Sequence, residues 1–205
     1  MLKNIWAFCY LSQKYYPLQH IQQKINGIYA LPNAELQLLL NAMERVEFAK
    51  NHIIISADKV ERYLYFIEKG IARAYCYTDK QEATFWFGQE GDLILSYNSY
   101  INQQPGYENI ELLEDSILYR ISDRTLQELY TNYISLANWG RKLAEQELIK
   151  TEERLINRQF RTAIERYNEL ITQTPSLIRR VQLGHIASYL GVTQVTLSRI
   201  RAELR

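Results

Sequence analysis

The sequence contains few of the residues that build metal and cofactor sites. Of its 205 residues, only two are cysteines and three are histidines. Cys9 and Cys76 lie far apart and have no partner at metal-ligand spacing, so we expect each to be a free buried thiol. His20, His52 and His185 are equally scattered. This composition excludes an iron–sulfur cluster, and we predict no metal and no cofactor.

The chain also has only eight glycines. Loops that cradle phosphate groups depend on clustered glycines. The sequence contains no P-loop, no nucleophile elbow and no glycine-rich loop that enters a helix. We therefore predict that the protein is not an enzyme.

Long hydrophobic runs are absent as well. The longest run near the start, residues 5–11, is far shorter than the ~18 residues that cross a bilayer, and it lacks the cleavage site of a signal peptide. We predict no membrane partner and no targeting segment, which leaves the cytoplasm as the expected location.

What the chain does have is an ordinary globular composition with an uneven distribution of charge. Hydrophobic residues make up 47% and charged residues 23%, which is enough to bury a core. Residues 158–205 contain eight basic and three acidic residues, a net charge of +5, whereas the rest of the chain carries sixteen basic and twenty acidic residues, a net charge of −4. A basic end on an acidic body indicates a module that binds a polyanion.

Residues 15–44 are predicted to be helical. The apolar residues that recur at helical spacing are Leu18, Ile21, Ile25 and Ile28. Gly27 is a candidate end for this helix, and Asn33 is a candidate N-cap for a second helix over residues 34–43. The first fourteen residues either pack on the body or form a loose extension.

Between residues 46 and 121 the pattern becomes typical of an antiparallel sheet. Short runs rich in Ile, Val, Tyr and Phe alternate with turn residues. The candidate strands are residues 52–56, 63–68, 72–78, 82–87, 93–95, 109–113 and 117–121. Six or seven short strands at this spacing indicate a small barrel or roll rather than a βαβ fold.

Three further helices are predicted after Ser122, a candidate N-cap: residues 123–132, a long helix over 135–154, and a helix near 158–172. The long helix carries an apolar stripe of Leu136, Trp139, Leu143, Ala144, Leu148 and Leu155. The mixed spacing of three and four residues favours pairing with a second copy, so we predict a homodimer formed through residues 135–154. The alternative is that the stripe packs onto the roll.

The last segment has the pattern of a helix-turn-helix, with helices over residues 183–190 and 193–204. Gly191 stands where the chain needs a left-handed turn, and Thr193 is an N-cap for the second helix. Leu197 and Ile200 face the first helix. An ordinary helical hairpin would explain these apolar positions, but not the acid-poor outer face: Glu203 is the only acidic residue after Glu169.

The outward residues of the second helix suit DNA. Glutamine pairs with adenine, arginine with guanine, and hydroxyl groups with bases or phosphates. We assign base reading to Gln194, Val195, Thr196 and Arg199. Phosphate contacts are assigned to Arg179, Arg180, Gln182, Ser198 and Arg201, and Thr193 belongs to the same surface.

The chain resembles the Crp/Fnr family of bacterial transcription regulators. At the C-terminus the resemblance rests on residues 186–193 (IASYLGVT) and 196–201 (TLSRIR). In the roll it rests on residues 65–70 (YFIEKG) with Arg73 and Tyr75, on residues 91–92 (GD), and on residues 110–116 (IELLEDS). It covers about residues 31–205.

The resemblance implies an α+β fold. It comprises N-terminal helices, an antiparallel β-roll of the double-stranded β-helix type similar to a cyclic-nucleotide-binding domain, a long dimerisation helix and a C-terminal helix-turn-helix. The implied divisions are an extension and helix over 1–30, the roll over 31–121, a linker and dimerisation helix over 122–157, and the DNA-binding domain over 158–205. The chain ends directly after the second helix, so we expect no β-hairpin wing.

The family's mode of action implies two further partners. A homodimer would bind a near-palindromic site in double-stranded DNA, with its recognition helices about 34 Å apart. RNA polymerase is a further candidate partner. Gln194 and Val195 stand where many relatives have an acidic residue in the second position, so the target sequence cannot be taken from them.

The expected effector site departs from the relatives that bind cyclic AMP. Those relatives hold the cyclic phosphate with an Arg-Ser/Thr pair, but residues 91–113 contain no Arg or Lys and include Asp92, Glu108 and Glu111. A buried phosphate needs a charge-assisted donor. We therefore predict that the protein does not respond to cyclic AMP.

The effector remains open. The chain has sixteen tyrosines, several in the roll, and they either simply suit strands or line a ligand pocket. On family geometry, that pocket would comprise Ser96, Tyr97, Ser99 and Tyr100 and would hold a neutral or aromatic small molecule. The rival function is a ligand-binding or scaffold roll whose C-terminal helices contact proteins.

Overall fold

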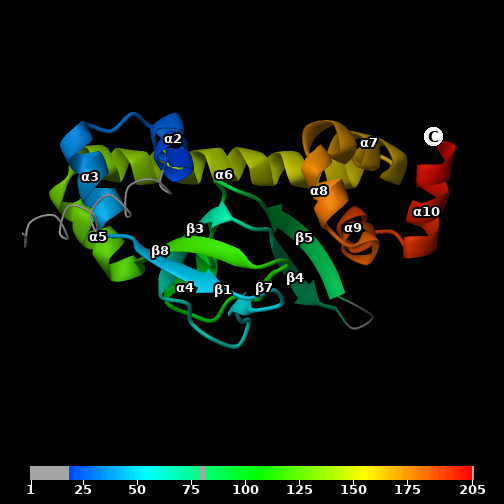
Figure 1. The fold of residues 1–205 in the computed structure, drawn as a ribbon, viewed down its shortest axis with the longest axis horizontal. Helices are drawn as coiled ribbons and strands as arrows, with labels where there is room; N and C mark the ends of the chain where they lie inside the picture. Colours follow the sequence, from blue (N-terminus) through cyan, green and yellow to red (C-terminus); the bar gives the residue numbers. More distant parts are fainter. Residues whose placement is uncertain (1–18, 79–81, 205) are drawn as a thin grey trace, which may run out of the picture.

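The structure is a computed structural model that describes residues 19–78 and 82–204. Figure 1 shows a β-roll with one long helix, α6 (Ile134–Phe160), running along its side. Short helices gather at one end of α6, and the C-terminal helices gather at the other. The expectations for residues 1–14, Cys9 and Leu18 lie outside the described residues.

Two short helices precede the roll, α2 (Gln19–Ile28) and α3 (Asn33–Asn41). Ile21 and Ile25 are buried, and Gly27 is the penultimate residue of α2, close to the predicted end. The prediction that Asn33 is an N-cap was wrong. The carbonyl of Pro32 accepts the hydrogen bond from the N–H of Leu36, 2.9 Å away, so Pro32 is the N-cap and Asn33 is already helical.

The roll consists of two four-stranded antiparallel sheets. One runs in the order β1 (Glu44–Phe48), β8 (Ser116–Ser122), β3 (Tyr63–Lys69) and β6 (Leu93–Ile94). The other runs in the order β2 (Ile53–Ile55), β7 (Asn109–Leu112), β4 (Ala72–Tyr77) and β5 (Glu82–Gly88). All seven predicted strands are confirmed to within one residue at each end.

One strand and one helix of the roll were missed. In β1 three of five side chains are charged, so only Val46 and Phe48, which pack on the core, carry a β signal. Helix α4 (Tyr97–Asn102) is a short polar segment between β6 and β7. Cys76 is free, as expected, but it is only half-buried.

The helices after the roll begin as predicted and then depart from the prediction. In α5 (Asp123–Asn132), the Ser122 hydroxyl accepts the Thr125 N–H at 3.0 Å, which confirms the cap. Helix α6 continues past residue 154, so the predicted helix start at 158 was wrong. Helix α7 (Ala163–Gln173) begins instead at a capping box between Thr162 and Glu165, which satisfies the free N–H groups at that point.

The apolar stripe of α6 divides into two parts. Leu136 and Trp139 are buried in the monomer's own core, and the Trp139 indole N–H donates to the carbonyl of Ile25 at 3.0 Å. Packing on the body, the alternative interpretation, therefore holds for the start of the stripe. Further along the helix, Leu148 is 70% exposed and Leu155 is 63% exposed.

Three helices complete the chain: α8 (Pro175–Arg180), α9 (Leu183–Leu190) and α10 (Gln194–Glu203). Their core includes Tyr167, Leu177 and Ile186, together with Ile71 from the roll. No described helix is both long and apolar enough to span a bilayer. Within residues 19–78 and 82–204, no group of three or more His, Cys, Asp and Glu side chains could hold a metal ion.

Candidate nucleic-acid interface and effector pocket

The turn between α9 and α10 has the geometry that the sequence predicted. Gly191 adopts a left-handed conformation with φ of +67°, and its N–H donates to the carbonyl of Ser188 at 3.1 Å. The N–H of Val192 donates to the carbonyl of Ala187 at 3.0 Å. No atom beyond the neighbouring residues lies within 4 Å of where a Gly191 Cβ would be, so the backbone conformation alone requires glycine here.

Helix α10 begins and packs as predicted. The Thr193 hydroxyl accepts the Thr196 N–H at 3.1 Å, which caps the helix. Leu197 and Ile200 are buried against α9, where Ala187 is also buried. The geometry of a helix-turn-helix therefore follows from local residue chemistry, and it fixes which face of α10 stays outside.

The outer face of α10 carries the predicted base-reading residues. The exposed residues are Thr193, Gln194, Val195, Thr196, Ser198 and Arg199, and Arg201 is half-buried. Neither Arg199 nor Arg201 forms an ion pair within the described part of the chain. Their guanidinium groups are therefore available to an external anion.

The predicted phosphate contacts before α9 differ in their surroundings. Arg179 and Gln182 are exposed. Arg180 instead forms ion pairs with Glu90, at 2.7 Å, and with Glu114, both on the roll. Burial alone would raise the pKa of Glu90, but hydrogen bonds from Arg180 and from the Gly70 N–H lower it to about 2. In this conformation the Arg180 side chain is therefore bound to the roll.

The helix-turn-helix docks on the edge of the roll through α9. Strand β5 is the last strand of its sheet, so some of its backbone groups have no partner strand. The Ser188 hydroxyl accepts the Thr84 N–H at 2.9 Å and donates to the Glu82 carbonyl at 3.0 Å. One serine on α9 thereby satisfies two backbone groups that a neighbouring strand would otherwise bind.

Arg73 of β4 is a buried charged residue at the contact between the roll and α9. It is only 3% exposed, and it pairs with Glu111 at 2.7 Å and with Glu82 at 2.8 Å. Its Nη1 lies 2.7 Å from Nδ1 of His185 on α9. Burial, and then the positive charge of Arg73, lower the pKa of His185. Arg73 is one of the residues on which the family resemblance rests, but its tie to His185 could not be predicted from the sequence.

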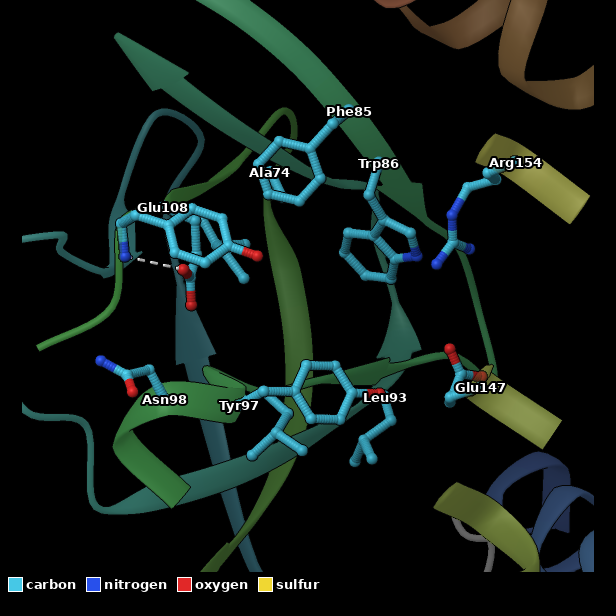
Figure 2. A pocket seen from close by; sticks show the side chains of 12 residues that line it. Ala74, Phe85, Trp86, Leu93, Tyr97, Asn98, Glu108, Glu147 and Arg154 are labelled. Atoms are coloured by element: carbon cyan, nitrogen blue, oxygen red, sulfur yellow. Dashed lines mark hydrogen bonds between the residues drawn. The ribbon is translucent and has the colours of Figure 1, made fainter. Parts of the chain in front are cut away.

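A pocket of about 90 Å³ lies between the roll and α6. Its lining residues are Ala74, Phe85, Trp86, Leu93, Leu95, Tyr97, Asn98, Tyr107, Glu108, Ile110, Glu147 and Arg154. Figure 2 shows Glu108 at one end, Phe85 and Trp86 near the middle, and Glu147 and Arg154 at the other end. Burial and the nearby Glu147 carboxylate raise the pKa of Tyr97 to about 12, so its phenol stays neutral.

Of the four predicted pocket residues, only Tyr97 lines this pocket. Ser96 is buried beside it. Ser99 is buried, and its hydroxyl donates to the Gln104 carbonyl and accepts the Glu61 N–H. Tyr100 packs in the other direction and accepts a hydrogen bond from Gln127 of α5. Helix α4, which the sequence did not reveal, turns these residues in different directions.

The missed pocket residues come from distant segments. Trp86 pairs with Ala74, but Thr84 pairs with Tyr75, so Phe85 is an extra residue in a β-bulge. A bulge breaks the alternation on which strand predictions rest. Arg154 comes from α6, so a basic side chain reaches the pocket although residues 91–113 contain none.

The comparisons with known proteins agree with this architecture. Residues 45–133 match the Cyclic nucleotide-binding domain family. FixK2 from Bradyrhizobium japonicum is 20% identical with a TM-score of 0.65, over 79% of this chain and 84% of FixK2. The Catabolite Activator Protein of Thermus thermophilus is 19% identical with a TM-score of 0.56, over 86% of this chain and 85% of that protein.

A third solved structure is that of a protein described as a transcriptional regulator of the Crp/Fnr family from Eubacterium rectale. It is 17% identical with a TM-score of 0.67, over 84% of this chain and 83% of that one. No curated protein sequence matches the chain. At these identities the likeness establishes the fold, which is that of the Crp/Fnr regulators.

Proposed function

We propose, from the match of the roll to the cyclic nucleotide-binding domain family and from the Crp/Fnr fold, that this protein is a transcription regulator that binds DNA sequence-specifically as a homodimer. One observation carries the proposal: the outer face of α10 is exposed and acid-poor, and its guanidinium groups form no ion pair with any described residue. A helical hairpin that only packed within a bundle would have no use for such a face.

The proposed division of labour follows the chemistry of the side chains. Base edges in the major groove would be read by Gln194, Val195, Thr196 and Arg199. The backbone phosphates would be bound by Arg179, Gln182, Thr193, Ser198 and Arg201. Arg180 would join them only after leaving Glu90 and Glu114, because its guanidinium group is engaged by both carboxylates.

The proposed dimer uses the exposed part of α6. Ala144, Leu148 and Leu155 are exposed at spacings of four and seven residues, which is the repeat of a two-helix seam. Pairing would remove this apolar surface from water. A twofold axis along α6 would give the two α10 helices opposite directions on DNA, as a near-palindromic site requires.

We also propose that cyclic AMP is not the effector. Glu108 and Glu147 put two carboxylates around the pocket, and its one basic lining residue, Arg154, lies at the end away from Glu108. A cyclic nucleotide would have to bring its phosphate into a site where acidic groups predominate.

The decisive experiment is selection of bound sequences from a random duplex pool by the full-length protein. We expect enrichment of a near-palindromic consensus, which tests base reading and dimer symmetry together. Isothermal titration with cyclic AMP should give no binding heat. Retention of all duplexes with equal affinity would contradict specific reading, and enrichment of a single half-site would contradict the dimer.

A further inference from the structure

Glu108 is a buried carboxylate that pairs with no cation in the described part of the chain. It is 6% exposed, and its hydrogen bond within the described chain comes from the N–H of Tyr107, 3.0 Å from Oε2. The two other acidic residues of this segment are neutralised: Asp92 by Lys24 at 3.4 Å, and Glu111 by Arg73 at 2.7 Å. A buried charge without a partner is costly, so Glu108 is the exception that needs an explanation.

A second unsatisfied group lies beside this carboxylate. The Ser96 hydroxyl is buried and has no hydrogen-bond partner among residues 19–78 and 82–204. A Cβ built on Gly106 would lie 2.6 Å from Ser96 Oγ and 2.7 Å from each Glu108 carboxylate oxygen. The hydroxyl and the carboxylate therefore both pack against Gly106, and within the described chain both have acceptor capacity that no protein donor uses.

Aromatic rings form much of the wall between Glu108 and α6. Phe85, Trp86, Tyr97 and Tyr107 all line the pocket, and the rings of Phe85 and Tyr107 lie 6.3 Å apart. The faces of aromatic rings carry partial negative charge and attract cations. The rings therefore favour a cationic ligand, as the Glu108 carboxylate does.

The protein's own cations near the pocket do not neutralise Glu108. Arg154 donates to the Thr151 hydroxyl at 2.8 Å and lies across the pocket from Glu108 (Figure 2). Lys150 forms an ion pair with Glu147 at 2.6 Å. The positive charge that would balance Glu108 is therefore absent from the described chain.

We propose that this pocket binds a small organic cation, a protonated amine with an aromatic or aliphatic body. The ammonium group would donate hydrogen bonds to the Glu108 carboxylate, and the body would lie along Trp86 and Phe85. This gives the effector of the proposed regulator a chemical class, and in that respect it rests on the proposed function.

The pocket is well placed to communicate with the DNA-binding end. Phe85 and Trp86 follow directly after Thr84, whose N–H binds Ser188 of α9. Arg154 lies on α6, the proposed dimer helix. A ligand that moved β5 or α6 would change the docking of α9, provided that it bound the docked and released forms with different affinity.

The test uses phenethylamine as the probe and two matched analogues, neutral phenylethanol and anionic phenylacetate. Binding to the full-length protein is measured by isothermal titration and by tryptophan fluorescence, since Trp86 lines the pocket. We expect phenethylamine to bind at least tenfold more tightly than either analogue. The variant Glu108→Gln should lose that preference.

A second variant guards against misfolding. Ser96→Ala removes the hydroxyl, which makes no capping hydrogen bond at the start of α4, so the fold should be kept. We expect it to keep the preference for phenethylamine over phenylethanol, because the Glu108 carboxylate remains. Equal affinity for the three compounds, unchanged amine binding by Glu108→Gln, or no amine binding would each overturn the proposal. Duplex selection tests the proposed function separately. A DNA consensus without amine binding would refute only this inference, and amine binding without a DNA consensus would refute only the proposed function.

Discussion

Nη1 of Arg73 lies 2.7 Å from Nδ1 of His185, and this contact joins the centre of the β-roll to the first helix of the helix-turn-helix. A guanidinium group can only donate, so Nδ1 must accept, and the proton of the neutral imidazole lies on Nε2. Protonation of His185 would put two cations in contact. The attachment of α9 and α10 to the roll therefore depends on a neutral histidine.

The first prediction concerns pH. Because the pKa of His185 is lowered below its ordinary value of 6.5, the docked state disfavours the protonated ring. The docking contribution is complete above that value and declines as pH falls through it. The melting temperature should therefore drop between pH 7.5 and 5.5 in the wild type. His185→Asn keeps an acceptor that does not titrate, so its drop over the same range should be smaller.

The pH range of that experiment has to separate the effect of His185 from the effects of nearby carboxylates. Glu111 and Glu82 oppose the lowering of the His185 pKa, but burial and Arg73 outweigh them. Glu90 contributes through a pKa lowered from 4.5 to about 2, so its stabilisation is complete above 4.5 and is lost only as pH falls towards 2. Measurements that stop at pH 5.5 therefore do not include the loss of the Glu90 contribution. An equal drop in the wild type and in His185→Asn would contradict the assignment to His185.

The second prediction concerns Arg180, which is held by Glu90 and Glu114. The double variant Glu90→Gln and Glu114→Gln should release this guanidinium group for DNA. One added phosphate contact makes the slope of log K against log salt concentration steeper by about 0.9. Fluorescence anisotropy with the selected duplex over a salt series measures this slope. An unchanged slope would show that Arg180 does not bind phosphate, and Arg180→Ala in the double-variant background should restore the original slope.

The third prediction separates base reading from phosphate binding. Arg199→Ala should weaken binding to the selected duplex by about 1–3 kcal/mol and relax specificity at one base position. Arg179→Ala, a change of the same charge, should weaken all duplexes to a similar extent. Binding to single-base variants of the duplex distinguishes the two. A uniform loss for Arg199→Ala would move this residue to the phosphate contacts.

The fourth prediction uses two glycines of the helix-turn-helix. Gly191→Ala places a side chain in the left-handed conformation at φ +67°, which costs about 1–2 kcal/mol even though the space is open. Gly184 is the second residue of α9, and the nearest atom to its added Cβ is Gln194 Oε1 at 3.9 Å. Gly184→Ala should therefore stabilise by about 0.5 kcal/mol, the lower end of the range for a glycine in a helix. Urea unfolding measures both, and the same sign for both variants would refute the backbone argument.

The sequence predicts best where the signals are local. Thr193, Gly191 and Leu197 define the helix-turn-helix within a few residues of one another, and the structure has each in its expected role. Seven of the eight described strands were also found, because turn residues bound them. The pocket was not, because Phe85 sits in a bulge and Arg154 arrives from a helix far along the chain. Pairings such as Arg73 with His185 depend on tertiary docking, which no local pattern encodes.

The last prediction concerns the dimer, and it depends on a distinction that the structure draws within α6. Leu136 is buried in the monomer, so changing it would unfold the protein and reveal nothing about assembly. Leu148 is 70% exposed, so Leu148→Glu should leave the monomer's fold intact while placing like charges on both sides of the seam. Sedimentation should then show a monomer. Affinity for the palindrome should fall at least tenfold, because the two half-sites would no longer be bound by linked modules.

Phe160→Glu is the matched control for this change. Phe160 is 74% exposed on the same helix, and it lies five residues past Leu155, about 140° around the helix axis from the stripe. The same apolar-to-acidic substitution there should leave both the dimer and the DNA affinity unchanged. If Leu148→Glu remains dimeric, or if Phe160→Glu dissociates, the two copies pair through a different surface. The recognition helices would then need a different twofold axis to reach a palindromic site.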